Sequence, residues 1–258
     1  MLPDYRNPPI NEVVCGVRFR PLDRFTLPQI GRFWNEIRVE FPTVQHVAPL
    51  ASEAGLAIDE ATGAPIPRVW FINQSDDRLV QLQVDHLFFN WRRRAGDYPR
   101  FPSIIDGFSR TLTTFLDFAT AADLGDFAPI ECELSYVNQM PKGQGWHEPR
   151  DLSNLLRDFC WNTDPKRFLP DPLVYGWQAR FPLPGALGRL QAKLSQATRK
   201  EDQMPLIVLE LSAKGIGDDK TPAGLFAWFD VAHEWIVRGF ADLTTERAQK
   251  DLWGRTDA

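Results

Sequence analysis

The sequence lacks the features that mark several large classes of protein. Its 258 residues contain no apolar run of the roughly 18 residues that a membrane-spanning helix needs. The first residues, MLPDYRNPP, contain no apolar segment typical of a signal peptide. A net charge of −5 argues against a generic DNA-coating protein, because binding to the phosphate backbone requires a broad positive field. We therefore expect a cytoplasmic protein without a membrane segment. Only a local basic patch could bind nucleic acid.

Residues that commonly hold metals or carry out catalysis are scarce. Cys15, Cys132 and Cys160 are far apart in the chain and form no C-x-x-C pair, which favours a reducing compartment. None of the four histidines lies within metal-ligand spacing of another histidine or a cysteine. The sequence contains no P-loop, G-x-S-x-G, H-E-x-x-H or G-x-G-x-x-G motif. We therefore predict no metal and no cofactor.

Apolar residues recur with two different periods. Alternation predicts strands over residues 11–19, 68–73, 78–91, 129–139, 173–181, 189–197 and 205–213. Apolar residues at steps of three and four predict helices over 27–41, 105–119 and 226–243, with Thr26 as the N-cap of the first. Residues 43–67 show neither period and are expected to form a long connection. A short helix is expected over 152–159, and another after Thr244 that Trp253 holds against the protein.

This element order predicts the α+β class, with a large antiparallel sheet and three long amphipathic helices packed on one face. Short links between strands favour hairpins over parallel crossovers. The order β-α-β-β-α followed by β-β-β-β-α suggests a single domain built from two pseudo-repeats, residues 8–125 and 126–243, with 244–258 as a C-terminal tail. The sheet face without helices should look towards water or a partner, and its polar residues are Gln81, Gln83, Asp85, Glu131, Glu133, Gln191 and Lys193.

The stretch LFFNWRRRAGDYPRFPS combines aromatic residues with arginines. Single-stranded nucleic-acid sites use this combination, with rings that stack on bases and guanidinium groups that bind phosphates. A charge cluster of this size is more often a solvated rim. Because both faces of the strand are apolar near its end, we favour a surface for a protein partner. Its candidate binding residues are Phe89, Trp91, Arg92, Arg93, Arg94 and Arg100.

Two alternatives use other residues. A curved sheet against a helix can enclose a small-ligand pocket, here lined by Trp70, Phe88, Tyr136, Trp177 and His233. A hydrolase could instead use His233 as a base with Glu131 or Asp85. His233 lies on the apolar stripe of the last helix, so a core histidine bonded to a backbone carbonyl is the structural interpretation.

Four motifs give the chain a resemblance to a known family: PPINEVVCGVRF, FWNEIRVEFP, YVNQ and AHEWIVRGFADLT…LWG. They are similar to a sporadically distributed family of bacterial proteins of unknown function. The resemblance covers nearly the whole chain and implies a cytoplasmic protein encoded by accessory genes, without implying a reaction. The matching positions are Pro8, Pro9, Glu12, Tyr136, Asn138 and Phe240.

The sequence thus predicts a non-enzymatic interaction or regulatory protein of an accessory bacterial system, related to defence or toxins. It would bind a protein partner, or a second copy of itself, through the sheet face and the arginine rim. A small-ligand-binding protein and a His/carboxylate hydrolase are the alternatives.

Overall fold

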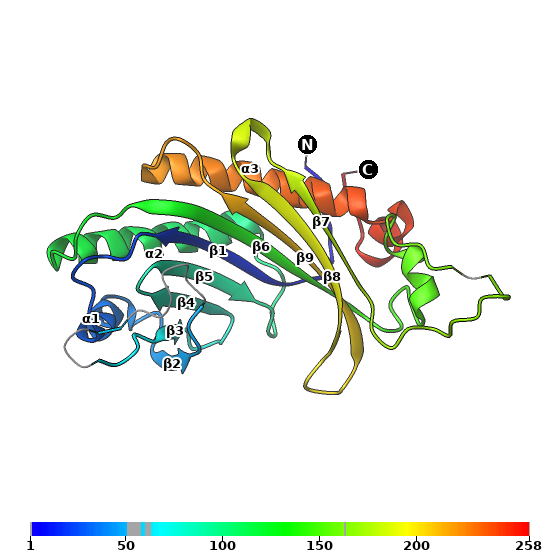
Figure 1. Cartoon of the computed structure of the whole chain (residues 1–258), viewed down its shortest axis with the longest axis horizontal. Helices are drawn as coiled ribbons and strands as arrows, with labels where there is room; N and C mark the ends of the chain where they lie inside the picture. The colour runs from blue at the N-terminus through cyan, green and yellow to red at the C-terminus, as the bar shows by residue number, and fades with distance from the viewer. Residues whose placement is uncertain (1, 51–57, 60–62, 163, 258) are drawn as a thin grey trace. The chain divides into compact units, whose positions relative to one another are not determined.

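The computed structural model describes residues 2–50, 58–59, 63–162 and 164–257. Among these residues, hydrogen bonds order nine strands as β2-β3-β4-β5-β1-β6-β9-β8-β7 in an antiparallel sheet (Figure 1). The strands are β1 (Ile10–Phe19), β2 (Thr43–Val47), β3 (Arg68–Ile72), β4 (Arg78–Gln83), β5 (His86–Arg92), β6 (Pro129–Pro141), β7 (Gly176–Pro182), β8 (Arg189–Thr198) and β9 (Pro205–Gly215). The helices are α1 (Leu27–Ile37), α2 (Phe101–Ala121) and α3 (Pro222–Leu243), with short turns η1 (Pro149–Asn154), η2 (Pro184–Ala186) and η3 (Ala248–Leu252). The α+β class and the antiparallel sheet are confirmed.

The chain divides into two compact units. Unit 1 consists of Met1–Asn11, Ser135–Lys214 and Phe226–Ala258, and unit 2 consists of Glu12–Leu134 and Gly215–Leu225. Each is described separately. None of the described helices is both long enough and apolar enough to cross a membrane.

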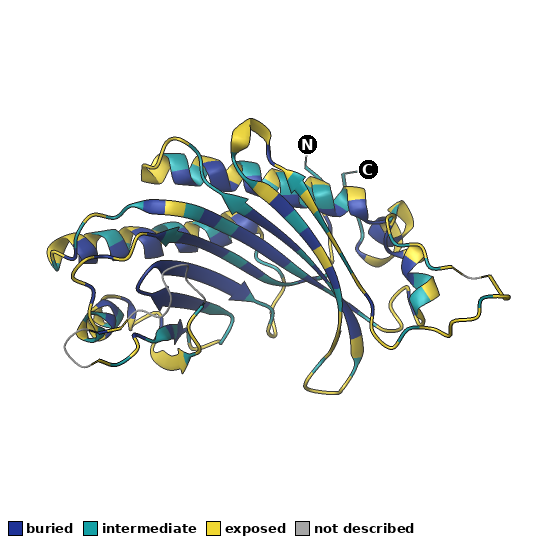
Figure 2. Ribbon diagram, viewed as in Figure 1, coloured by how far each residue is buried: buried dark blue, intermediate teal, exposed yellow. Residues whose placement is uncertain are grey.

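Unit 2 packs α1 and α2 through aromatic side chains. Phe33 of α1 meets Phe115 and Phe118 of α2, with ring centroids 5.5 and 5.6 Å apart. Helix α2 also approaches β5 closely, because a Cβ atom on Gly107 would lie only 2.6 Å from the ring of Phe89. Figure 2 shows the resulting buried stripe of α2 and the almost wholly buried strands β4 and β5. The predicted helical periodicity therefore identifies the buried side of both helices.

The predicted strand over 78–91 is wrong, because the structure has two strands there. Strand β4 ends at Gln83, β5 begins at His86, and Val84 and Asp85 form a tight turn between them. This turn changes which side chains share a face. Phe88 lies opposite Gln81, and the next residue, Phe89, faces α2.

Two other predictions about unit 2 need correction. The predicted connection over 43–67 contains β2, which pairs with β3, while residues 51–57 and 60–62 of that prediction lie outside the described residues. Gln81, Gln83 and Asp85 were expected to face water or a partner, yet they are only 7%, 5% and 5% exposed. Glu131 and Glu133, predicted for the same face, are half-buried. In unit 1, the predicted polar-face residue Gln191 is half-buried and Lys193 is exposed.

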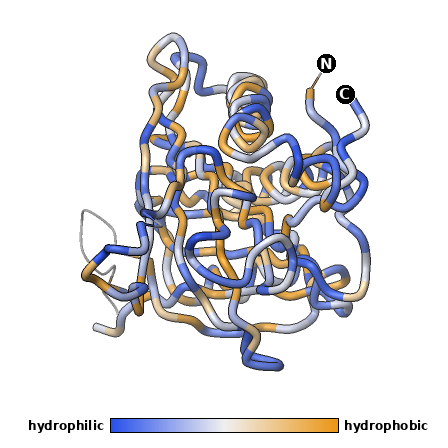
Figure 3. Tube along the Cα trace, turned by 90° about the vertical axis from the view of Figure 1, so that its right-hand side faces the viewer, coloured by the Kyte–Doolittle hydropathy of each residue, from blue (hydrophilic) through white to orange (hydrophobic). Residues whose placement is uncertain are grey.

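Unit 1 packs α3 against the hairpin of β7 and β8. The indole nitrogen of Trp228 donates to the carbonyl of Leu187 at 2.8 Å. The N- and C-terminal segments lie side by side (Figure 3), joined by the bond from Asn7 N to Trp253 O at 3.0 Å. The ring of Trp253 lies 5.0 Å from that of Phe240. The structure confirms a short helical segment after Thr244, η3. The short helix predicted over 152–159 is wrong in its bounds, because η1 begins at Pro149 and ends at Asn154.

Candidate functional site

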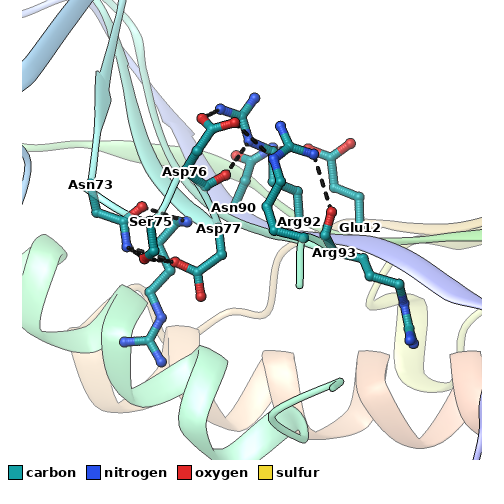
Figure 4. A network of polar contacts seen from close by, with 10 residues as sticks. Glu12, Asn73, Ser75, Asp76, Asp77, Asn90, Arg92 and Arg93 are labelled. Atoms are coloured by element: carbon teal, nitrogen blue, oxygen red, sulfur yellow. Dashed lines mark hydrogen bonds and ion pairs between the residues drawn. The ribbon is translucent and has the colours of Figure 1, made fainter. Parts of the chain in front are cut away.

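The predicted arginine rim is tied down within unit 2. Arg92 forms an ion pair with Asp76, which lies in the turn between β3 and β4 (Figure 4). Arg94 forms a second ion pair with the same carboxylate. Arg92 Nε also donates to the Asp76 carbonyl at 2.8 Å, and the Arg92 side chain is 16% exposed. Burial opposes ionisation of Asp76, but the bond from Arg94 and the charges of both arginines outweigh it and lower the pKa of Asp76. Two of the three rim arginines therefore stabilise the end of a hairpin.

The remaining predicted rim residues occupy different environments. Phe89 and Trp91 are 1% and 3% exposed, so their rings are not available to stack on a partner. Arg93 and Arg100 place their guanidinium groups 6.0 Å from the rings of Trp91 and Tyr98, respectively. Of this set, Arg94 and Arg100 are exposed.

The turn that receives Arg92 is held by its own polar side chains. Asn73 Nδ2 donates to Asp77 Oδ1 at 2.7 Å, and Asn73 Oδ1 accepts from the Arg78 amide at 3.0 Å. The Arg92 amide donates to the Asp77 carbonyl at 2.8 Å. These bonds tie the two ends of the turn together, so its polar side chains have a structural role.

We predict that Arg92→Ala lowers the free energy of unfolding by about 1 kcal/mol, because it removes a charge-assisted pair with a half-exposed partner. Chemical denaturation measures this change. Arg110→Ala is the matched control, because Arg110 forms an exposed i,i+4 pair with Asp106 on α2. Equal, negligible effects of both substitutions would show that Arg92 has no structural role.

A chain of hydrogen bonds runs across the buried polar side chains of unit 2. Asn90 Nδ2 donates to Glu12 Oε1 at 2.6 Å, and Gln81 Nε2 donates to Asn90 Oδ1 at 2.7 Å. Gln81 Oε1 accepts from Trp70 Nε1 at 2.9 Å and from Arg68 Nη1 at 3.2 Å. Buried amides are tolerated when they are hydrogen-bonded in this way. The polar groups on this face of the sheet therefore bond to one another inside the protein.

The proposed catalytic carboxylates have other contacts. Asp85 Oδ1 lies 2.6 Å from His86 Nδ1 and accepts from Gln83 Nε2 at 3.1 Å. Burial would raise the pKa of Asp85, but these contacts outweigh it and lower that pKa. Glu131 lies 3.8 Å from Arg18 Nη2. Both carboxylates belong to unit 2, where they pair with these neighbours.

His233 is half-buried on α3, in unit 1, and its ring lies 6.1 Å from that of Tyr136. Burial lowers the pKa of His233 to about 4, although the nearby charge of Glu234 acts in the opposite direction. The imidazole is therefore neutral at pH 7. Among the described residues, no group of three or more His, Cys, Asp or Glu side chains could hold a metal ion.

The predicted aromatic pocket is distributed over both units. Trp70 and Phe88 belong to unit 2, whereas Tyr136, Trp177 and His233 belong to unit 1. Within unit 1, Trp177 lines a void of about 10 Å³, which is room for about one water molecule. That void is too small for a ligand.

A larger cleft, of about 560 Å³, lies in unit 1 along α3. One wall consists of Phe181 from β7 and Leu190 from β8, and the other of Trp235, Gly239 and Leu243 from α3. The helix residues are spaced by four, so they lie on one side of α3. A volume of 300–1,000 Å³ is usual for small-molecule sites.

Strand β7 ends the sheet order, so one of its edges has no strand partner among the described residues. Leu183 N donates to Gly188 O at 2.9 Å, continuing the register of β7 and β8. Because hydrogen-bonded pairs alternate in antiparallel strands, every second residue back from Leu183 bonds to β8. The intervening residues Gln178 and Arg180 therefore direct their backbone N–H and C=O groups towards the open edge.

The segment just before β7 is largely exposed (Figure 2), and it contains an unusual number of apolar residues. Of the nine large apolar side chains exposed among the described residues, four lie between 168 and 174. Phe168 and Leu173 are each 96% exposed, Val174 is 81% exposed and Leu169 is 61% exposed. This cluster leads into the open edge of β7, and clustered exposed apolar residues mark interaction sites.

Sequence reasoning missed both features of unit 1. Part of the signal for the exposed segment was present, because Phe168 and Leu169 lie between Pro165 and Pro170 without any period that would bury them. Leu173 and Val174 were predicted as the start of the strand over 173–181, but β7 begins only at Gly176. The four-residue spacing of Trp235, Gly239 and Leu243 was also present. The contributions of Phe181 and Leu190 to the same cleft depend on long-range packing.

Comparisons with known proteins do not assign the chain to a family. No protein-family model matches it. No curated protein matches it significantly. Among solved structures, the di-domain ARO/CYC StfQ from the steffimycin biosynthetic pathway aligns with 10% identity over 90% of this chain and 99% of that chain. The TM-score is 0.17, a value too low to indicate a shared fold.

Proposed function

We propose that this protein is a non-enzymatic interaction protein that binds an extended segment of a partner protein along the open edge of β7. The observation that carries the proposal is the unpaired edge of β7 directly after the exposed apolar segment 168–174. Together they offer main-chain hydrogen bonds and an apolar contact area in one continuous part of unit 1.

The physical basis is β-strand addition. A partner strand would bond to the outward N–H and C=O groups of Gln178 and Arg180, and main-chain bonds of this kind supply affinity with little dependence on sequence. Apolar side chains before the strand would then contribute specificity. Long, open edges carry a risk of aggregation, so native proteins usually cover or charge them. A partner that covers β7 would remove this risk.

This proposal moves the interaction surface away from the arginine rim. Two rim arginines already pair with Asp76, and the aromatic rings beside them are buried. A partner at the rim would have to compete with these internal contacts, whereas the β7 edge offers backbone groups that none of the other described strands uses.

The proposed setting is an accessory bacterial system related to defence or toxins. It rests on the resemblance of PPINEVVCGVRF and the other three motifs to the sporadically distributed bacterial family. Identification of the captured partner tests this setting.

We predict that Gln178→Pro reduces capture of the partner about tenfold, because it removes one outward N–H and leaves a partner carbonyl without a donor. Proline is tolerated at this position of an edge strand because its missing N–H faces away from β8. The measurement is quantitative mass spectrometry of proteins retained by the tagged chain in its source organism. Gln178→Thr is the matched control, because threonine keeps the N–H and favours strands.

Leu173→Lys with Val174→Lys tests the apolar part of the surface. Val39→Lys is its control, because Val39 is 97% exposed and belongs to unit 2. We expect the partner to be lost from the double variant and kept by the control. A partner retained equally by Gln178→Pro, Gln178→Thr and the lysine variants would contradict the proposal, provided that thermal unfolding shows all of them folded.

A further inference from the structure

The α3 cleft is a second, separate feature of unit 1, and its charges select a ligand class. Its floor is narrow at Gly239, where a Cβ atom would lie 3.2 Å from Leu190 Cδ2. A side chain at position 239 would therefore intrude between helix and strand. Glycine is unfavourable in the middle of a helix, so its presence at position 239 fits a place where α3 and Leu190 of β8 approach closely.

The two arginines that line the cleft are already neutralised. Arg238 Nε lies 2.7 Å from Glu234 Oε1 on the same helix. Arg255 makes two bonds of 3.0 Å to the carboxylate of Asp257 and donates to Gln249 at 2.7 Å. Neither guanidinium group is therefore available as a strong anion site.

The two carboxylates that line the cleft have no such compensation. Asp158 follows η1 and Asp242 lies on α3, and both are exposed. Neither has an ion pair or a hydrogen-bonded side-chain partner among the residues that the structure describes. The cleft thus carries a net negative charge beside apolar walls.

The apolar walls determine the rest of the ligand. Phe181, Leu190 and Leu243 present aromatic and aliphatic carbon, and Trp235 is half-buried beside them. A tryptophan face attracts cations through its quadrupole, most strongly where water is partly excluded. These walls suit the apolar body of a ligand, while the carboxylates suit its charged end.

We propose that the α3 cleft binds a small organic cation, a protonated amine carried on an apolar body. This goes beyond the proposed partner binding, because the site needs neither the open edge of β7 nor a second protein. Anions of the same size are repelled by Asp158 and Asp242, and neutral analogues lose the electrostatic part of the binding free energy.

Three probes with one apolar body test the proposal: 2-phenylethylammonium, 2-phenylethanol and phenylacetate. Isothermal titration calorimetry on the full chain measures their affinities, and the indole N–H signal of Trp235 reports where they bind. We expect the cation to bind about fivefold more tightly than the alcohol, and the acid not to bind. The preference should shrink as salt is added, because these carboxylates are exposed.

Variants locate the charge effect. Asp158→Asn with Asp242→Asn should weaken binding of the cation about fivefold and leave the affinity for the alcohol unchanged. Asp230→Asn is the matched control, because Asp230 is an exposed aspartate on α3 that does not line the cleft. Equal affinity for cation and alcohol, no effect of the double variant, or no binding of the cation up to about 20 mM would each overturn the proposal. None of these outcomes bears on capture of a partner at β7.

Discussion

Replacing Gly16 by alanine is expected to lower the free energy of unfolding by about 3 kcal/mol. Gly16 is buried in β1 directly opposite Phe88 of β5. A Cβ atom there would lie 1.5 Å from Phe88 Cδ1 and 2.6 Å from Cγ. Because the contact reaches the base of the ring, a small rotation cannot relieve it. Phe88 is 6% exposed and its ring lies 5.5 Å from that of His86, so it has little room to move.

Urea denaturation of the wild type and the variant measures this effect. Gly31→Ala is the matched control, because Gly31 is exposed within α1 and a Cβ atom there would meet nothing within 4 Å. That substitution should stabilise the protein by up to about 1 kcal/mol through helix propensity. Combining Gly16→Ala with Phe88→Ala should cost less than the sum of the two single changes. If the two changes in the free energy of unfolding simply added, the methyl group introduced at position 16 would not be in contact with the ring of Phe88.

His233 is expected to make the protein less stable in acid. The pKa of His233 is about 4 in the folded protein, below the ordinary value of about 6.5, and burial is the main cause. Above pH 6.5 the side chain is neutral in both states and contributes no pH dependence. As the pH falls from 6.5 to 4, the unfolded chain binds a proton that the folded protein does not, so stability is lost. The loss levels off below pH 4 at about 2 to 3 kcal/mol, allowing for partial solvent exposure.

His233→Gln removes the titrating imidazole, so the variant loses this contribution to the pH dependence of stability. The free energy of unfolding of the wild type should therefore fall by about 2 to 3 kcal/mol more than that of the variant between pH 7 and pH 4. Other titrating groups cancel in this difference. A difference between the two proteins that stays constant with pH would mean that His233 titrates normally in the folded state.

The helices could be predicted from sequence because each carries a local period. Ile30 and Ile37 of α1, and Phe108, Leu112 and Phe115 of α2, lie on the predicted stripes and are buried. Pro102 and Pro222 also fall in the first turns, where proline is favoured. These signals act within one or two turns and need no information from distant residues.

The strand pairing was harder because one turn carried no signal. Val84 and Asp85 link β4 to β5 without the glycine or asparagine that usually marks a two-residue hairpin. The stretch RLVQLQVDHLFFNW therefore resembled a single strand. Side chains alternate between the two faces of a strand with a period of two. Because the turn was missed, the residues of the predicted strand that follow it, 86–91, were assigned to the wrong face of the sheet.

The candidate sites depended still more on long-range contacts. The sequence shows Arg92 and Arg94 but not Asp76 folding back to pair with them. It likewise shows Asp158 and Asp242 far apart, although both line one cleft. Strand order decides which strand is left at an edge, and no local pattern in β7 encodes its position there.

Hydrogen exchange on the captured complex tests the central claim most directly. Amide exchange would be compared between the chain alone and the chain with its partner bound. We predict new protection of the Gln178 and Arg180 amides, because their N–H groups would bond to the added strand. Unchanged exchange in Gly176–Pro182, with new protection at Arg92–Arg94 instead, would contradict it and return the interaction surface to the arginine rim.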